Sequence, residues 1–404
     1  MTNFFWASLA LVSVPPESEP ASVSDTDSVE SMEACAQQAA PTPLRESFDR
    51  LVDRIVSNSD GKGRAGSSAP GAVLAVISPD WSYCRAAGFT SAGGSTPLTF
   101  DAPFQIGSNT KMMTAAVLLQ LHEEGRLSVD DQLSDHLPKI ASRLPHGNEI
   151  TLRQLANHTS GVYSYTDNAP DGTPGIMEGT LTDQAKMVLR FRPNELVDFA
   201  IKHGVPDFAP GENGRWNYSN TGYIILGLII EKIAGQPLES VFEKRIFAPL
   251  GMTNSYLWSD VPRASFRVPD SYFIAPYEIE ATDWNLSQGW AAGAVISTAY
   301  DMSIFVKALL NCELFDDNST LALMQETVET GSPTIPRYGI GLAEKAPGIW
   351  GHGGQTMGFQ SDVAYIPDLQ VAITGWGNSA NNLNSASAFL VASMLRSSVE
   401  DERE

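Results

Sequence analysis

Cysteine is scarce in this chain of 404 residues, which has only Cys35, Cys84 and Cys312. The count is odd and no Cys-x-x-C pair occurs, so neither a disulfide framework nor a cysteine-rich zinc site is indicated. Cys35 lies in an acidic leader, which leaves Cys84–Cys312 as the one bridge that we expect to be feasible. Two buried free thiols are favoured over that bridge, and the redox compartment stays open.

Positive charge is also in short supply, because 26 Lys and Arg face 47 Asp and Glu, for a net charge of −21. Nucleic acids and anionic membrane surfaces are bound by clustered Lys and Arg, so both are excluded as partners. Part of the acidity is local, since residues 1–40 contain acids and no Lys or Arg. Solubility is the simplest explanation of the rest, with salt adaptation or a cationic substrate as alternatives.

Long hydrophobic runs are missing from the body of the chain. The longest, Tyr223 to Ile230, is far too short to span a bilayer, so no transmembrane anchor is expected. The run Phe4 to Val14 has the length of a signal-peptide core, but no Lys or Arg precedes it and no small-residue cleavage site follows closely. The protein is expected to be periplasmic or secreted if that run is a signal, and cytoplasmic otherwise.

Hydrophobic periodicity places helices in the middle of the chain and strands near both ends. Three-to-four-residue apolar spacing predicts helices over 44–56, 108–124, 151–158, 193–203, 221–233, 298–310 and 386–395. Short apolar runs bounded by turns predict strands over 71–78, 82–88, 338–342, 360–366 and 371–376.

This order predicts an α/β (α+β) fold, in which an antiparallel sheet built from both chain ends is flanked by helices and carries an inserted, mainly helical domain. Residues 1–43 are expected to be a disordered acidic leader and residues 399–404 an acidic tail. Between them, 44–398 forms one catalytic unit. Its sheet part covers about 44–107 and 291–398, and its helical insert about 108–290.

The most informative short run is Phe104 to Lys111, FQIGSNTK, which places Ser108 and Lys111 one turn apart on one face of a helix. A serine hydroxyl becomes a nucleophile when a base takes its proton, and a lysine can do so only if its pKa is lowered. The motif alone is weak. A second Ser-x-x-Lys, Ser59 to Lys62, lies in a Gly/Ser loop, and Ser108 could instead be a helix N-cap.

Two further runs follow Ser108 in the chain. Tyr218-Ser219-Asn220 precedes a helix, where the phenol could relay a proton to a leaving group and the amide could hold a substrate carbonyl. Trp350 to Gln355, WGHGGQ, lies near the C-terminal strands, and its glycines allow close approach of backbone to a ligand. Alone, Tyr218 could be a core aromatic and His352 a structural histidine.

Together and in this order, the three runs resemble the serine β-lactamase and penicillin-binding-protein superfamily, in its class C-like branch with D,D-carboxypeptidases, D-aminopeptidases and esterases. The resemblance covers roughly Leu44 to Leu395. Further similar runs are Leu155 to Gly161, Phe208 to Gly211, Pro249 to Met252 and Ala292 to Thr298.

The resemblance implies a role for each motif residue. Ser108 would be the acylated nucleophile, Lys111 its first proton acceptor and Tyr218 the general acid/base. Asn220 would orient the substrate amide, and the backbone N–H groups of Ser108 and Gln355 would form the oxyanion hole.

The third motif departs from the usual pattern of the family. His352, followed by Gly353 and Gly354, stands where most of the family has the lysine of Lys-Thr-Gly. A histidine is mostly neutral at pH 7, so a fixed cation for a substrate carboxylate is lost. This lowers the expectation of an efficient β-lactamase and favours a peptidase or esterase.

The histidines form no His-Glu-x-x-His and no zinc-ligand spacing, so no metal is expected, and we also expect no cofactor. His158 is expected to make a structural hydrogen bond. The resemblance therefore implies a serine hydrolase that acts through an acyl-enzyme on small peptides with D- or non-standard residues, for example linearised non-ribosomal peptides.

A carboxylesterase of small acyl esters is the alternative, followed by a weak β-lactamase or a non-catalytic β-lactam or peptide sensor. The partner is a small peptide or ester, selected by the loops Tyr163 to Thr182 and Trp258 to Trp290. The oligomeric state is open.

Overall fold

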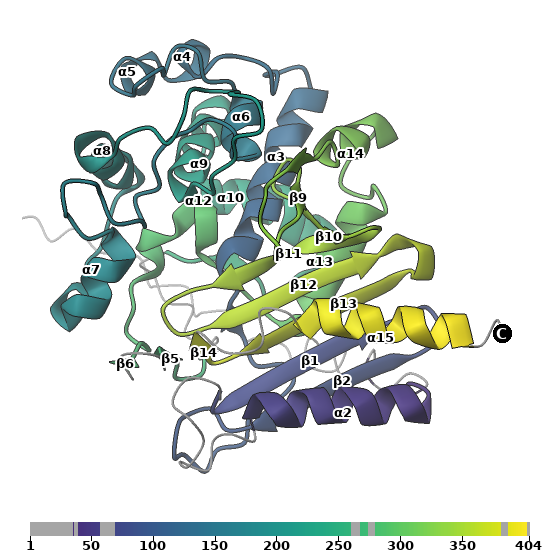
Figure 1. Cartoon of the computed structure of the whole chain (residues 1–404). Helices are drawn as coiled ribbons and strands as arrows, with labels where there is room; N and C mark the ends of the chain where they lie inside the picture. Colours follow the sequence, from purple (N-terminus) through teal and green to yellow (C-terminus); the bar gives the residue numbers. More distant parts are fainter. Residues whose placement is uncertain are drawn as a thin grey trace, which may run out of the picture.

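An eight-stranded sheet in the order β2-β1-β13-β12-β11-β10-β9-β8 forms the centre of the protein (Figure 1). The structure is a computed structural model that describes residues 35, 39–56, 69–259, 267–273, 279–380 and 387–401. The candidate signal run Phe4 to Val14 and the second Ser-x-x-Lys at Ser59 to Lys62 lie outside these residues.

Both ends of the chain contribute strands to this sheet, and each neighbouring pair is antiparallel. This confirms the predicted fold class. The strands are β1 (Gly71–Ile77), β2 (Ser82–Gly88), β8 (Val328–Glu329), β9 (Arg337–Tyr338), β10 (Ala343–Ala346), β11 (Ile349–Gln355), β12 (Gln360–Ile366) and β13 (Val371–Gly377).

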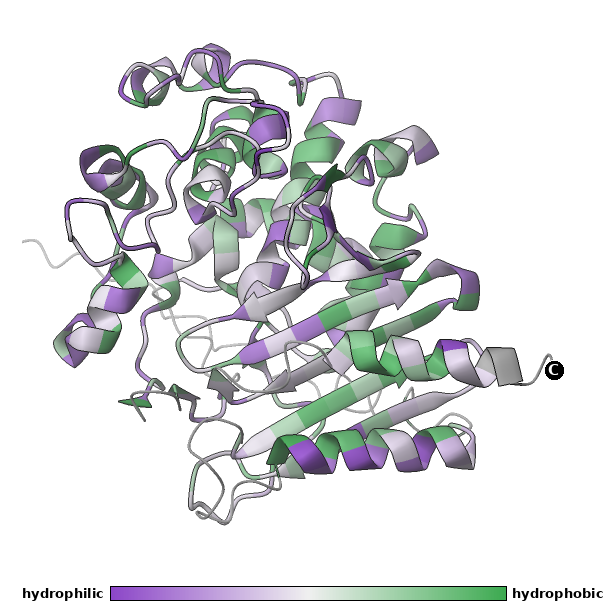
Figure 2. Ribbon diagram, in the orientation of Figure 1, coloured by the Kyte–Doolittle hydropathy of each residue, from purple (hydrophilic) through white to green (hydrophobic). Residues whose placement is uncertain are grey.

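The first and last helices, α2 (Thr42–Val56) and α15 (Ser387–Asp401), lie side by side on one face of the sheet (Figure 1). The apolar residues of α2 are buried against the sheet, and Figure 2 shows hydrophobic and hydrophilic residues alternating along this helix. Phe48 and Val52 of α2 are buried against alternate residues of the strands, such as Val76 and Ile373. This is the burial pattern of a strand whose two faces meet different layers.

The other face carries α13 (Ala299–Leu310) and the helical middle of the chain, where α3 (Thr110–Glu123) and α9 (Asn220–Ala234) are both largely buried. One continuous apolar core runs from β1 through these helices. The other helices are α4 (Leu133–His136), α5 (Pro138–Ala141), α6 (Leu152–Ala156), α7 (Ile176–Thr182), α8 (Pro193–His203), α10 (Leu238–Phe242), α11 (Ala248–Leu250), α12 (Trp290–Gly293) and α14 (Asn318–Met324).

Short turns of helix and two small sheets complete the fold. The helical turns are η2 (Gly107–Asn109), η3 (Gln184–Lys186), η4 (Glu243–Phe247), η5 (Leu286–Gln288) and η6 (Pro367–Leu369). The small sheets join β3 (Phe104–Gln105), β7 (Val295–Ser297) and β4 (Tyr256–Leu257), and β14 (Ser379–Ala380), β5 (Tyr272–Phe273) and β6 (Ile279–Glu280). The expected boundaries of leader, sheet part, helical insert and tail stay a prediction.

The disulfide expectation is wrong. Cys35 and Cys84 form a disulfide, and Cys312 is free and partly exposed. The physical reason is that Cys35 and Ala39 both lie against β2, where Ala39 forms a bridge with Ser82 and Cys35 bonds to Cys84. As for membranes, no helix within the described ranges combines the length and the apolar character that crossing a bilayer requires.

Candidate active site

Ser108 lies in η2, between strand β3 of a small sheet and the start of α3. The Ile106 N–H donates to the Val295 carbonyl over 3.0 Å, and Gly107 then takes a φ of +55°. Ser108 is not an N-cap: Ile106 and Asn109 occupy the two cap positions, and neither makes a side-chain cap bond. The Ser108 hydroxyl is instead directed to Lys111, with a distance of 3.1 Å between Oγ and Nζ.

Lys111 is fully buried, and its amine has three oxygen neighbours. Nζ lies 2.7 Å from Asn220 Oδ1 and 2.7 Å from the Ala292 carbonyl oxygen, besides Ser108 Oγ. Burial lowers the pKa of Lys111 well below its ordinary value, which favours the neutral amine. A neutral amine has two N–H groups, and Asn220 and Ala292 accept both. Its lone pair is then left for the Ser108 O–H, so the arrangement can take the proton of the serine.

Asn220 and Tyr218 reach this amine from the start of α9. The Ser219 hydroxyl caps that helix by accepting the Gly222 N–H, and the Asn220 Nδ2 donates to Thr166 Oγ1 over 3.0 Å. Lys111 Nζ lies 4.8 Å from the centre of the Tyr218 ring. Burial raises the pKa of Tyr218 above its ordinary value, and the neighbouring Ser108 hydroxyl opposes this rise. Tyr218 is therefore a neutral phenol beside the serine and the lysine.

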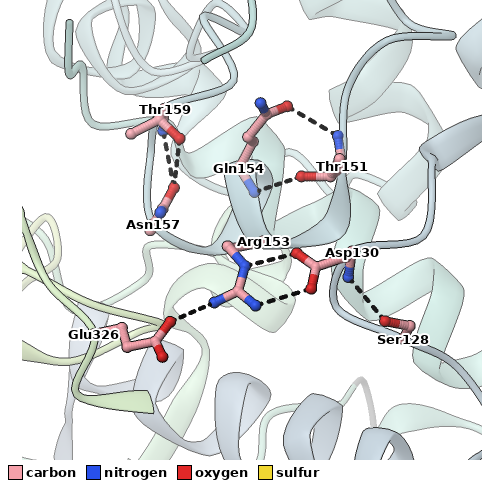
Figure 3. Close-up of polar contacts among 8 residues, drawn as sticks. All are labelled: Ser128, Asp130, Thr151, Arg153, Gln154, Asn157, Thr159 and Glu326. Carbon is pink, nitrogen blue, oxygen red and sulfur yellow. Dashed lines mark hydrogen bonds and ion pairs between the residues drawn. The ribbon is translucent and has the colours of Figure 1, made fainter. Parts of the chain in front are cut away.

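The turn that supports Tyr218 follows α6 and is held by an ion-pair and capping network (Figure 3). The Arg153 guanidinium pairs with Asp130 over 2.7 Å and with Glu326 over 3.0 Å. In the same turn, Asn157 Oδ1 accepts the Thr159 hydroxyl over 2.7 Å. These contacts connect the loop before α6, α6 itself and the segment after α14, so the turn has a fixed position.

His158 lies within this turn at a φ of +65°, and its side chain is fully buried. Its Nδ1 accepts the Ser219 N–H over 3.1 Å, which confirms the expected structural hydrogen bond. Its ring lies 4.3 Å from that of Tyr218, measured between centres. Burial lowers the pKa of His158 well below its ordinary value, so the ring is a neutral support for Tyr218.

The end of β11 comes close to Ser108 because two glycines remove side chains from the seam between strand and helix. A Cβ on Gly107 would lie 2.7 Å from the Gln355 nitrogen, and one on Gly354 would lie 2.0 Å from the Ile106 oxygen. Real Cβ atoms do not approach other atoms so closely. The backbones of Ser108 and Gln355 are thus brought together, as two donors to one oxyanion would have to be.

His352 occupies the middle of β11 and is only 3 % exposed. Its Nδ1 lies 2.5 Å from the Gly353 carbonyl, which only accepts, so Nδ1 carries the proton. Its Nε2 then accepts the Tyr338 hydroxyl over 2.8 Å. Burial lowers the pKa of His352 to about 3, so the ring is neutral.

A pocket opens in front of Ser108. It is lined by residues of α9, α12, β11 and both loops expected to select the substrate: Ser108, Tyr165, Thr166, Met177, Asn220, Trp284, Gln288, Gly289, Ala292, Gly293 and Gln355. Of the predicted site residues, Ser108, Asn220 and Gln355 line this pocket and Lys111 lies behind Ser108. Tyr218, His352, Gly353 and Gly354 lie outside its lining.

Sequence reasoning missed several contacts of the site. Tyr338 bonds His352, Thr166 bonds Asn220, and the Ala292 carbonyl bonds Lys111. Ala292 was within a family-like run, but nothing in the sequence marked its carbonyl as a lysine partner. Within the ranges described, no three His, Cys, Asp or Glu side chains are grouped as metal ligands.

Comparison with known proteins identifies the family of this chain. The Beta-lactamase family matches residues 48–390. A D-stereospecific amidohydrolase from Streptomyces sp. has a TM-score of 0.72 at 31 % identity, with 85 % of this chain and 97 % of that chain covered.

Two curated relatives are more distant. A putative penicillin-binding protein PbpX from Bacillus subtilis is 28 % identical over 71 % of this chain and 64 % of its own length. A D-aminopeptidase from Cereibacter sphaeroides is 24 % identical over 87 % of this chain and 63 % of its own. The chain thus spans just under two thirds of the length of either relative. Because the family model matches most of the chain, the chain belongs to the β-lactamase and penicillin-binding-protein family.

Proposed function

We propose that this serine hydrolase cleaves amide bonds next to D- or other non-standard residues, through an acyl-enzyme on Ser108. The observation that carries the proposal is the buried amine of Lys111, 3.1 Å from the serine hydroxyl and bonded to two carbonyl acceptors. A base held neutral in this way beside a hydroxyl is what nucleophilic catalysis by serine requires.

In the proposed reaction, Ser108 Oγ attacks the substrate carbonyl while its proton passes to Lys111 Nζ. The developing oxyanion is bound by the backbone N–H groups of Ser108 and Gln355. Tyr218 gives its phenolic proton to the departing nitrogen and recovers a proton from Lys111, after which water hydrolyses the ester on Ser108. An amide nitrogen leaves only when protonated, so Tyr218 matters more for amides than for esters.

The preference for D-residues is supported by the relatives, two of which are named a D-stereospecific amidohydrolase and a D-aminopeptidase. Linearised non-ribosomal peptides are one natural source of such bonds. A β-lactam or a peptide with a free carboxylate is a poorer candidate. No Lys or Arg of the described chain lines the pocket. Lys111 is buried behind Ser108, and His352 is neutral.

The test compares short peptides that carry D-Ala or L-Ala at the acyl position with a simple acyl ester, using Ser108→Ala as the blank. We expect cleavage of the D-peptide, loss of that cleavage by at least about 10³-fold in the blank, and little cleavage of the L-peptide. Cleavage of the ester alone would make the protein an esterase. If none of the three is cleaved, the non-catalytic alternative replaces the proposal.

A further inference from the structure

Two residues that line the pocket have three buried polar side-chain atoms without a hydrogen-bond partner within the described residues. They are Nε2 and Oε1 of Gln288 and Nε1 of Trp284. Gln288 is 3 % exposed and Trp284 is 6 % exposed. Buried polar groups are nearly always paired, and an unpaired one costs free energy, so three together at one wall call for an explanation.

The backbone around these side chains is well satisfied, which excludes a poorly ordered turn as that explanation. The Tyr165 hydroxyl donates to the Gln288 carbonyl, and the Asn285 N–H donates to the Met187 carbonyl over 2.9 Å. Ser287 Oγ accepts the Phe191 N–H over 2.9 Å. The turn η5 is therefore fixed by the two neighbouring loops, and it presents side chains whose bonding capacity is unused.

The unused atoms match one kind of ligand group. Gln288 Oε1 accepts hydrogen bonds, while Gln288 Nε2 and Trp284 Nε1 donate, so together they offer one acceptor atom and two donor atoms. A secondary amide presents one N–H and one carbonyl oxygen with two lone pairs, which is the complementary set. An ammonium would leave both donors facing a positive charge, and no Asp or Glu of the described chain lines the pocket to neutralise it.

The position of the pocket indicates which half of the substrate it receives. Ser108 and Gln355 line it, whereas Tyr218 does not. In the proposed reaction Tyr218 protonates the leaving group, so that half departs on the side of Tyr218 and His352. The pocket, which Tyr218 does not line, is then left for the acyl half.

We propose that Gln288 and Trp284 bind a second amide on the acyl side of the scissile bond, so that the enzyme acts on N-acylated or internal residues and disfavours a free α-amine. This inference rests on the proposed function and assigns its substrate more narrowly. The name of the D-aminopeptidase relative indicates a substrate with a free amine. For this chain the inference predicts the opposite preference, for a substrate whose amine is acylated.

The experiment measures kcat/KM of the full chain for three anilides: N-acetyl-D-alanine, D-alanine and propanoic acid p-nitroanilide. The last lacks the second amide. We expect the N-acetyl compound to be preferred, and Gln288→Leu to reduce its advantage over the propanoyl compound by about 10–100-fold. Gln288→Glu keeps the shape and adds a negative charge, so it should shift the preference towards the free amine of D-alanine p-nitroanilide.

Two controls separate binding from folding. Gln325→Leu removes a glutamine amide outside the pocket lining and should leave the ratio unchanged. Gln288→Leu also removes two unpaired buried atoms, so its thermal unfolding midpoint should be equal to or above that of the unaltered protein.

The outcomes distinguish the two proposals. If the anilides are cleaved but Gln288→Leu lowers kcat/KM equally for all three, or if the free amine is preferred, the amide site is wrong and the hydrolase stands. If no anilide is cleaved, binding is measured with Ser108→Ala and the methylamides of N-acetyl-D-alanine and D-alanine. Discrimination by at least tenfold in that case supports the site without the reaction, and equal binding overturns both.

Discussion

At the scale of single residues, the site buries basic side chains in a way that favours their uncharged forms. Lys111 and His352 are both buried, and burial lowers the pKa of each, which favours the neutral form of both side chains. A lysine without its proton is a base, and a histidine without its charge is a hydrogen-bonded spacer between β11 and Tyr338. The same buried environment thus suits Lys111 to accept a proton and His352 to hold a hydrogen bond to Tyr338.

Neutral buried histidines predict a sensitivity to acid. His352 has a pKa of about 3 when folded, against ~6.5 for a free histidine, so the unfolded chain binds the extra proton between these values. The stability that depends on His352 is complete above about pH 6.5 and is lost as the pH falls towards 3. Burial also lowers the pKa of His158, so His158 adds to the loss of stability in acid.

In the variant His352→Asn, the decline in unfolding free energy between pH 6 and 4 should be shallower by about 1.4 kcal/mol per pH unit, the value for one proton. Denaturant unfolding at a series of pH values measures this. Equal slopes for the two proteins would show that His352 is protonated in the native state or exposed to solvent.

The four residues of Ser-x-x-Lys and Tyr-x-Asn could be selected from the sequence because their types and spacing are local. Their partners could not. Thr166 and Ala292 are far along the chain from Asn220 and Lys111, which they bond, and Ala292 acts through a backbone atom that no residue type reveals. The roles assigned to the motif residues stay predictions until the variants are measured.

At the scale of elements, the proposed oxyanion site depends on the seam between η2 and β11, where the Ser108 and Gln355 backbones meet. β11 was not predicted from the sequence, since glycine is disfavoured in strands and three occur in Ile349–Gln355. At two of these glycines, close packing against the neighbouring backbone leaves no room for a side chain. A Cβ on Gly351 or Gly354 would lie 2.0 Å from a carbonyl oxygen, of Val363 or Ile106 respectively. By contrast, β2, β12 and α8 begin and end at the residues predicted, because their apolar patterns are regular.

The strand predicted over 338–342 is wrong beyond Tyr338. The chain turns there, with the Gly339 N–H donating to the Leu342 carbonyl over 2.8 Å and Gly341 at a φ of +70°. The short apolar run 338–342 does not indicate this turn, because the turn depends on packing against α3. A Cβ on Gly341 would lie 2.4 Å from the Cβ of Ala115 in that helix.

Gly107→Ala tests the seam. The added Cβ would lie within 3.0 Å of three backbone atoms of Gln355, at a φ of +55°. We expect kcat to fall by about 10²–10³, the effect of losing one oxyanion donor. Steady-state kinetics on the peptide and ester substrates measures this fall.

Gly125→Ala is the matched control. Gly125 follows the other end of α3 at a φ of +68° and its added Cβ would meet nothing within 4 Å. It should cost about 1 kcal/mol of stability and leave kcat unchanged. If both variants lose activity alike, backbone strain rather than the seam is responsible.

At the scale of the whole molecule, the sheet unites residues from the two ends of the chain, and the Cys35–Cys84 bridge extends this to the segment before α2. The bridge closes a loop across 49 residues of sequence. Closing such a loop restricts the unfolded chain and stabilises a folded protein by about 2–4 kcal/mol. Sequence spacing could not indicate this pairing, because it depends on Ala39 lying beside β2.

The bridge predicts one reactive thiol, Cys312, in unreduced denatured protein and three after reduction. Cys35→Ser should lower the unfolding free energy by about 2–4 kcal/mol, and reductant should destabilise the unaltered protein but not this variant. Cys312→Ser is the control and should keep the response to reductant. Three reactive thiols before reduction would contradict the pairing.

The bridge also governs what proteolysis at the N-terminus can release. A cut before Cys35 frees the preceding peptide at once. A cut between Cys35 and Thr42, where α2 begins, leaves that peptide attached to β2 through sulfur. Such a nicked protein migrates as one species until it is reduced and as two afterwards. Release of the N-terminal peptide therefore depends on reduction whenever the cut lies between Cys35 and Thr42.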